Sequence, residues 1–210
     1  MKLKNNAMLQ KETSSSILNH WVLAISCLLL CLSGVGFLFR VDGIGALFGG
    51  FPLMRTIHNW LGVVFAISLV VSTSNWLKEC ITFGFNDIEW CLAAGGYLGK
   101  LYKKKAPPMH KLNTGQKAFY LCLLLFGFFI VLSGAGIWLM PNHQKVMVWS
   151  VILHNISFIM IGIFLPIHIY LSTLGNPGTL QIMTSGKVPV WWARKKSQLW
   201  VEEVEQGKTH

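Results

Sequence analysis

Four histidines stand out because of the sequence around them. His20, His58, His154 and His168 lie in long apolar runs that contain no Lys, Arg, Asp or Glu. An imidazole in hydrocarbon is costly unless it is paired, so an ionisable residue in a membrane-spanning segment is a functional candidate by default. Imidazole is also a common ligand of transition metals. The pattern predicts four buried metal ligands.

Two of these histidines share one apolar run. His154 and His168 are fourteen residues apart, which on a helix is about 40° short of four full turns and ~21 Å along the axis. They therefore lie on one face, one near each side of a bilayer ~30 Å thick. That arrangement fits two stacked haems. A zinc site is disfavoured, because zinc needs its ligands gathered at one point.

The composition indicates an integral membrane protein. The chain has 210 residues, 53% of them hydrophobic and only 12% charged. Backbone groups in lipid must be satisfied within the chain, which requires helices here. We expect an all-α membrane protein of one domain over residues 1–210, a four-helix bundle with a cytoplasmic tail at 175–210. Stretches of ~20 uncharged residues predict four spans, at residues 17–39, 56–77, 118–140 and 146–174.

The basic residues indicate a topology rather than a nucleic-acid partner. Of the 18 Lys and Arg residues, fifteen lie before the first span, between the second and third, or after the fourth. Only Arg40, Arg55 and Lys145 lie in the other two loops. By the positive-inside rule both termini are cytoplasmic. We therefore expect membrane lipid, and no nucleic acid, around this chain.

With this topology, the depth of each histidine follows from its place in its span. His58 and His154 lie near the outer side, and His20 and His168 lie near the inner side. Two imidazoles on each iron leave no open coordination position, which suits electron transfer. A single membrane histidine can also be a hydrogen-bonded packing residue. The matching depths favour two bis-histidine haems b.

Arg55 precedes His58 by one helical turn. A haem propionate requires a cation near the membrane edge, and Arg55 is placed to provide one for the outer haem. Alternatively it extends to the membrane boundary as other boundary arginines do.

Two further segments have no apolar span character. We expect residues 1–16, which are polar, to be a tail that orders only against a partner. The segment from Asp87 to Tyr102 places Trp and Tyr before a run of lysines, which predicts an amphipathic helix on the membrane surface.

The first and third predicted spans share a short repeat. The repeated Leu-Ser-Gly of residues 32–34 and 132–134 indicates close helix packing, or room for a flat macrocycle.

Five short motifs in order resemble the cytochrome b (gamma) subunit of membrane-bound, quinone-linked formate dehydrogenases. They are Asn19-His20-Trp21, Arg55-Thr56-Ile57-His58, Asn113-Thr114-Gly115-Gln116-Lys117, the pair His154 and His168, and the tail that runs from Gly186-Lys187-Val188-Pro189 to Arg194-Lys195-Lys196. Together they cover nearly the whole chain.

The resemblance implies a dihaem subunit of a complex in a bacterial inner membrane. Its electrons would come from an iron-sulfur beta subunit on the outer face, served by a molybdenum or tungsten alpha subunit that oxidises formate. They would reduce menaquinone or a related quinone near the inner haem, and the complex could form a higher oligomer. His58 and His154 would bind the outer haem, and His20 and His168 the inner one.

The resemblance also implies a quinone pocket at Asn113, Gly115 and Gln116. An Asn-x-x-Gln sequence at a helix start is equally a capping arrangement, in which both side chains serve backbone groups. In addition, the family often has Arg where this chain has Ile17, so the cation for an inner propionate would be another residue, such as Lys117 or Lys187.

Two other functions share some of these features. A cytochrome b subunit of an uptake NiFe hydrogenase or of a thiosulfate reductase could use the same histidines. A haem-free membrane anchor or transporter would need none of them. The electron donor is determined by the partner subunits.

Overall fold

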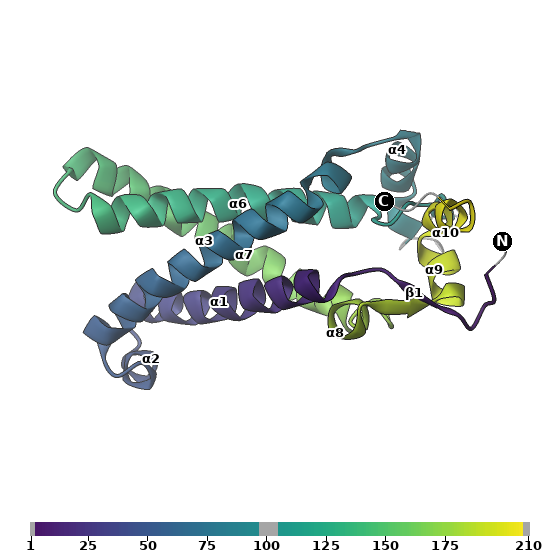
Figure 1. The fold of residues 1–210 in the computed structure, drawn as a ribbon. Coiled ribbons are helices and arrows are strands. Elements are labelled where there is room, and N and C mark those ends of the chain that lie inside the picture. The colour runs from purple at the N-terminus through teal and green to yellow at the C-terminus, as the bar shows by residue number, and fades with distance from the viewer. Residues whose placement is uncertain (1–2, 97–104, 208–210) are drawn as a thin grey trace. The chain divides into compact units, whose positions relative to one another are not determined.

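The structure is a computed structural model that describes residues 3–96 and 105–207. It is mostly helical (Figure 1), and four helices are long and apolar enough to cross a membrane. This confirms the predicted fold class and the number of spans. The four helices are α1 (Ser14–Phe39), α3 (Phe51–Ile81), α6 (Thr114–Leu139) and α7 (Gln144–Ser172).

The largest difference from the predicted spans is in α3, which begins five residues before residue 56 and ends four residues after residue 77. Pro52 lies in its first turn, where the missing N–H has no intrahelical partner to lose. The sequence predicts Arg55 and Lys78 to be loop residues, because charge ends the apolar run. Both continue the helix, since a long basic side chain at a helix end can reach polar surroundings.

The chain forms two compact units. Unit 1 comprises Met1–Ile17, Trp76–Leu121 and Tyr170–His210, and unit 2 comprises Leu18–Asn75 and Cys122–Ile169. Unit 2 holds all four of the histidines singled out above, and unit 1 holds the segment from Asn113 to Gln116.

Unit 2 is a bundle of the four long helices. Its buried apolar centre contains Leu23, Cys27, Phe65, Leu69 and Ile161, which come from α1, α3 and α7, with side chains of α6 packed against them. Many large apolar side chains face outward, as expected for helices surrounded by lipid. The short helix α2 (Asp42–Leu47) follows α1.

The repeated glycines of unit 2 serve close packing. A Cβ at Gly34 would lie 3.3 Å from the Phe158 ring, and one at Gly134 would lie 3.3 Å from the His154 ring. Both contacts are those of close helix packing, which is one of the two interpretations of the Leu-Ser-Gly repeat.

Unit 1 contains a small sheet that the sequence did not predict. Strand β1 (Met8–Gln10) pairs antiparallel with β2 (Lys187–Pro189), with Leu9 opposite Val188. The expectation that residues 1–16 order only against a partner is therefore wrong. Leu9 finds a buried apolar site inside the same chain, which a polar tail sequence does not reveal.

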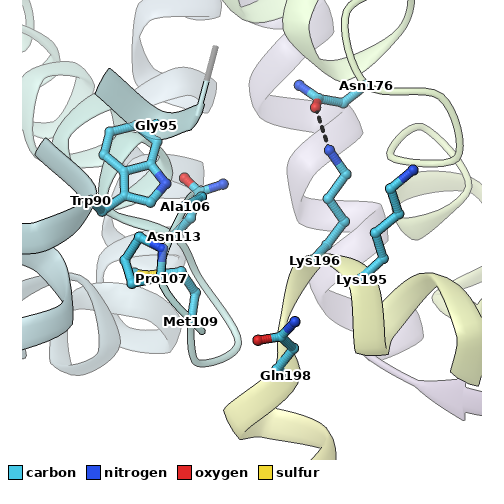
Figure 2. A pocket seen from close by; sticks show the side chains of 10 residues that line it. All are labelled: Trp90, Gly95, Ala106, Pro107, Met109, Asn113, Asn176, Lys195, Lys196 and Gln198. Carbon is cyan, nitrogen blue, oxygen red and sulfur yellow. Dashed lines mark hydrogen bonds between the residues drawn. The ribbon is translucent and has the colours of Figure 1, made fainter. Parts of the chain in front are cut away.

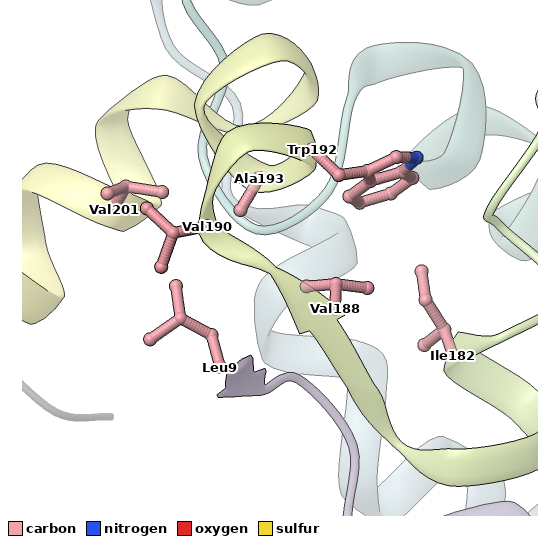
Figure 3. Close-up of a cluster of buried hydrophobic side chains, with 7 residues drawn as sticks. All are labelled: Leu9, Ile182, Val188, Val190, Trp192, Ala193 and Val201. Carbon is pink, nitrogen blue, oxygen red and sulfur yellow. The ribbon is translucent and has the colours of Figure 1, made fainter. Parts of the chain in front are cut away.

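The sheet supports a compact apolar core (Figure 3), formed with the short helices α8 (Ile182–Ser185), α9 (Val190–Lys196) and α10 (Gln198–Glu205). Its buried members are Leu9, Ile182, Val188, Val190, Trp192, Ala193 and Val201.

Helix α4 (Phe85–Leu92) lies in unit 1 and is followed by the short 3-10 helix η1 (Ala94–Gly96). The first half of the predicted surface helix is thus helical. Its second half, around Tyr97 to Tyr102, lies outside the described residues. Asp87 of α4 is buried, which an amphipathic surface helix does not require, and its partners are described below.

Candidate functional site

The structure brings the four histidines together in two pairs. The ring centroids of His58 and His154 are 6.3 Å apart, and so are those of His20 and His168. All four rings are half-buried. These are the two pairs expected from their depth in the spans.

The separation of each pair matches the space that one metal ion needs between two imidazoles. Two metal–nitrogen bonds of about 2 Å each, with two ring radii of about 1.1 Å, join ring centroids about 6 Å apart. Each pair could therefore hold one iron ion between its two rings. The donor set fits haem b, because two neutral imidazoles are ligands that haem iron accepts.

Ser33 orients the His58 ring. The Ser33 Oγ lies 2.8 Å from the Leu29 carbonyl oxygen and 2.7 Å from Nδ1 of His58. A hydroxyl has one hydrogen, and donating it to the carbonyl leaves the oxygen to accept from Nδ1–H. Nε2 of His58 then carries the lone pair that a metal ligand needs.

His154 of α7 has a matching arrangement, in which its partners lie on α6. Its Nδ1 lies 3.1 Å from Ser133 Oγ and 3.1 Å from the Ile130 carbonyl oxygen. A carbonyl only accepts hydrogen bonds, so Nδ1 is the protonated nitrogen and Nε2 carries the lone pair. Gly134 allows the ring to lie against α6, since a Cβ there would approach it to 3.3 Å.

The helix that carries His20 is fastened next to that ring. Asn19 Nδ2 donates to the Ser68 carbonyl oxygen over 3.1 Å, and Ser68 Oγ lies 2.8 Å from Asn19 Oδ1. These bonds join α1 to α3. The Trp21 ring lies edge-on to His20, with centroids 5.6 Å apart.

Sequence reasoning missed the serines Ser33, Ser68 and Ser133. For Ser33 and Ser133 a signal exists, because each is the Ser of the repeated Leu-Ser-Gly sequence. Nothing near Ser68 in the sequence indicates that it faces Asn19.

The three candidate propionate cations have different surroundings, and one of them, Lys187, is exposed. Arg55 is exposed on α3, three residues before His58. Lys117, of unit 1, instead bonds within its own unit: its Nζ lies 2.9 and 3.0 Å from the two carboxylate oxygens of Asp87 and 2.7 Å from the Thr82 carbonyl oxygen. These three acceptors use all three hydrogens of the ammonium group.

Asp87 joins α4 to the first turn of α6. Besides Lys117, it accepts hydrogen bonds from the Gly84 backbone N–H at 2.9 Å and the Thr114 hydroxyl at 2.8 Å. Burial alone would raise the pKa of this carboxyl, but the Gly84 N–H, Lys117 and Thr114 outweigh it and lower the pKa below its ordinary value.

Asn113 and Gln116 form the reciprocal cap that the sequence allowed. The Asn113 backbone N–H donates to Gln116 Oε1 at 3.0 Å, and the Gln116 backbone N–H donates to Asn113 Oδ1 at 2.9 Å. Each cap uses the amide oxygen, since within a side-chain amide only the oxygen accepts hydrogen bonds. The side-chain NH₂ groups, which are donors, are therefore not used by the cap.

A cavity of about 160 Å³ in unit 1 adjoins this cap. Figure 2 shows Trp90, Pro107, Met109 and Asn113 on one side of it, and Asn176, Lys195, Lys196 and Gln198 on the other; Gly95 and Ala106 complete the lining.

Gly115 contacts the same cavity wall. A Cβ at Gly115 would lie 2.7 Å from Cη2 of Trp90, so only glycine allows α4 to approach the start of α6 this closely. The cavity thus combines a flat aromatic wall with the amide of Asn113, which are suitable contacts for a planar carbonyl compound.

Comparison with known proteins agrees with these features. Residues 13–186 match the family model described as prokaryotic cytochrome b561. The cytochrome b556(fdo) subunit of formate dehydrogenase from Escherichia coli (strain K12) is 27% identical over 210 residues, which is 97% of each chain.

Two other relatives have related names. The cytochrome b556(Fdn) subunit of the nitrate-inducible formate dehydrogenase of the same strain is 26% identical, over 90% of this chain and 88% of its own. The formate dehydrogenase cytochrome b556 subunit of Haemophilus influenzae is 23% identical, over 97% of this chain and 86% of its own.

Proposed function

The chain belongs to the prokaryotic cytochrome b561 family, and from this we propose that it is the dihaem membrane subunit of a respiratory formate dehydrogenase. It is a bacterial membrane protein with four apolar helices. The relatives reported above are cytochrome b subunits of formate dehydrogenases and align over 86% or more of their own length, which supports the same role for this chain.

The observation that carries the proposal is the pair of 6.3 Å ring separations. His58 and His154 would hold the outer haem b, and His20 and His168 the inner one. Because α7 contributes one ligand to each pair, its fourteen-residue spacing fixes the step between the two levels. When bound, the haems would supply one-electron redox chemistry along this step.

The remaining residues of the site hold these ligands in place. Ser33 and the Ile130 carbonyl fix the outer rings in the tautomer that presents Nε2. Asn19 and Ser68 hold the start of α1 beside α3, and with it the position of His20. Arg55, exposed near His58, would neutralise an outer propionate.

The partners follow from the topology that the basic residues indicate. With both termini in the cytoplasm, the histidine pair His58 and His154 faces the outer side. An iron-sulfur beta subunit would deliver electrons there, supplied by a molybdenum or tungsten alpha subunit that oxidises formate. Electrons would then move inward, and each one transferred against the membrane potential stores ~2.3 kcal/mol per 100 mV.

The acceptor would be menaquinone or a related quinone bound at Asn113, Gly115 and Gln116. The cap supports this role, because it orients both amide NH₂ donors while leaving them available for a quinone carbonyl. The Trp90 ring beside Gly115 supplies an apolar wall for a flat ring.

The test is purification of the chain with its partner subunits, followed by a reduced-minus-oxidised spectrum and an assay of quinone reduction with formate, hydrogen or thiosulfate as donor. We expect a b-type α band, two haems for each chain, and quinone reduction with formate only. Absence of the band would contradict haem binding. Reduction with hydrogen or thiosulfate instead would assign the chain to one of those complexes.

A further inference from the structure

Four charged side chains that the proposed function does not use gather inside unit 1. Lys11 and Glu12 are only 6% and 5% exposed, although both lie close to the N-terminus. The Lys111 Nζ lies 3.6 Å from Glu12 Oε1 and 3.5 Å from Glu79 Oε1. We call Lys11, Glu12, Glu79 and Lys111 the charge cluster. Its members come from the N-terminal segment, the end of α3 and the residues before α6.

The charge cluster has the features of a hydrated network rather than of a tight structural ion pair. Its ion-pair distances exceed the ~2.8 Å of a direct charge-assisted hydrogen bond. Glu79 Oε2 is buried and has no hydrogen-bond partner in residues 3–96 and 105–207. Polar groups separated by more than ~3.5 Å are commonly bridged by water. Such a pair also gains little net stability from burial, so stability alone does not explain the charge cluster.

Burial shifts the pKa values of two of its members. Burial lowers the pKa of Lys11 to about 8, against the opposing effect of Glu12. Burial also raises the pKa of Glu12, and Glu79 raises it further. Lys111, Ser16 and Lys11 lower this pKa, but the effect of burial is larger. Titratable groups with shifted pKa values in one buried place are candidates for proton transfer.

Two short steps along the chain link the charge cluster to residues that line the cavity. Lys111 is two residues before Asn113, which lines the cavity. Ser197 Oγ lies 3.4 Å from Lys11 Nζ and 3.5 Å from the Lys111 carbonyl oxygen, and the next residue, Gln198, lines the cavity as well. The Lys11 ammonium is also held over the Trp192 ring, 5.3 Å from its centroid.

We infer that the charge cluster delivers protons to the quinone in this cavity, an inference that rests on the proposed function. Reduction of a quinone to a quinol adds two electrons and two protons, and each carbonyl oxygen becomes a hydroxyl. Oxidation of formate to carbon dioxide by the partner subunits supplies the two electrons. The charge cluster passes on two protons, one after the other, and water on the cytoplasmic side replaces them.

The test uses the complete complex with formate as donor and a water-soluble menaquinone analogue as acceptor, and compares Glu12→Gln and Glu79→Gln with the parent. Each substitution keeps the shape of the side chain and removes its ability to take up a proton. We expect kcat for quinone reduction to fall about tenfold, with the KM for quinone and the haem content unchanged. The rate should also decline more steeply as pH rises. The control is Glu203→Gln, since Glu203 contacts exposed His110 outside the charge cluster.

The outcomes separate the two proposals. If both variants keep the parental kcat and pH profile in a complex that reduces quinone, proton delivery by the charge cluster is wrong and the proposed function stands. If the parent complex binds haem but does not reduce quinone, both are wrong. If Glu12→Gln misfolds and loses haem, the result for Glu79→Gln alone tests proton delivery. The Glu79 side chain is 35% exposed, so its replacement disturbs less packing.

Discussion

The Ser33 hydroxyl lies 2.7 Å from Nδ1 of His58. The same relationship recurs in the second half of unit 2, where Ser133 Oγ lies 3.1 Å from Nδ1 of His154. In this pair, each histidine thus contacts the Ser hydroxyl of a Leu-Ser-Gly sequence through its Nδ1. Such outer partners set the tautomer and direction of a metal-binding ring.

Replacing Ser33 tests this relationship. We expect Ser33→Ala to weaken haem retention at the outer site about tenfold or more, because His58 loses the acceptor that holds its ring. Haem loss to apomyoglobin, followed by absorbance, measures it. Ser26→Ala is the matched control on the same helix, since the Ser26 hydroxyl bonds only to the Leu23 carbonyl among the interactions described. Equal haem loss in both variants would contradict the role of Ser33.

Removal of one histidine of the inner pair should separate the two haems. We expect His168→Ala to lower haem content from two to one for each chain and to abolish quinone reduction, because His20 alone would then be left to hold the inner haem. A pyridine haemochrome assay and a formate–quinone assay measure these effects. Exposed His143, replaced in His143→Ala, is the control. Retention of two haems in His168→Ala would show that His20 and His168 do not share one.

A methyl group at Gly115 should push α4 away from the cap. In Gly115→Ala the new Cβ would lie 2.7 Å from Cη2 of Trp90, and overpacking of this kind costs about 1–3 kcal/mol. We expect the KM for quinone to rise about fivefold, with haem content unchanged. Adding Trp90→Phe removes the ring atoms that clash and should restore thermal stability. No recovery in the double variant would mean that the clash is elsewhere.

The Lys117–Asp87 pair should be important for the stability of unit 1. Their side chains are 5% and 7% exposed, so Lys117→Met leaves a buried carboxylate without its cation, at a cost of about 3 kcal/mol. Denaturant unfolding of the solubilised complex measures it. Lys145→Met, at an exposed site, should change stability by less than about 0.5 kcal/mol. If Asp87→Asn combined with Lys117→Met is no more stable than Lys117→Met, the cost is not due to the unpaired charge.

Lys11 should make stability depend on pH in the alkaline range. Its pKa is about 8 in the folded chain against an ordinary 10.5. Between these values the folded chain has lost this proton while the unfolded chain retains it, so stability rises with pH across this window. Lys11→Met removes a buried charge, so it should be more stable than the parent at low pH. This difference in the free energy of unfolding should shrink by about 3 kcal/mol between pH 8 and 10.5. Unfolding followed by tryptophan fluorescence measures it, with exposed Lys105→Met as the control. A constant difference would show that Lys11 titrates normally.

Much of the fold could be predicted because the spans of a membrane protein are long apolar stretches of its sequence. Apolar length alone indicated α1, α3, α6 and α7, and the largest error occurred in α3, where charged residues such as Arg55 continue the helix beyond the apolar run. The helical period then placed His154 and His168 on one face. The cap of Asn113 and Gln116 was also predictable, since both residues lie within one turn.

The contacts between distant segments could not be predicted. The pairing of β1 with β2, the burial of Asp87 against Lys117 and the approach of Trp90 to Gly115 each join residues that have no common local pattern. The charge cluster is the clearest case, because Lys11 and Glu12 look like solvated residues of a polar tail.

By itself, the sequence determined the four long apolar helices and the helical face that His154 and His168 share, because hydrophobic length and helical period are local properties of the chain. The tertiary structure alone decided which serine orients which histidine, how the cap meets a cavity, and which charges are buried together. Those outcomes depend on the packing of distant segments, such as those of Lys11 and Ser197, which are 186 residues apart. Such contacts form only once hydrophobic burial has brought the segments together.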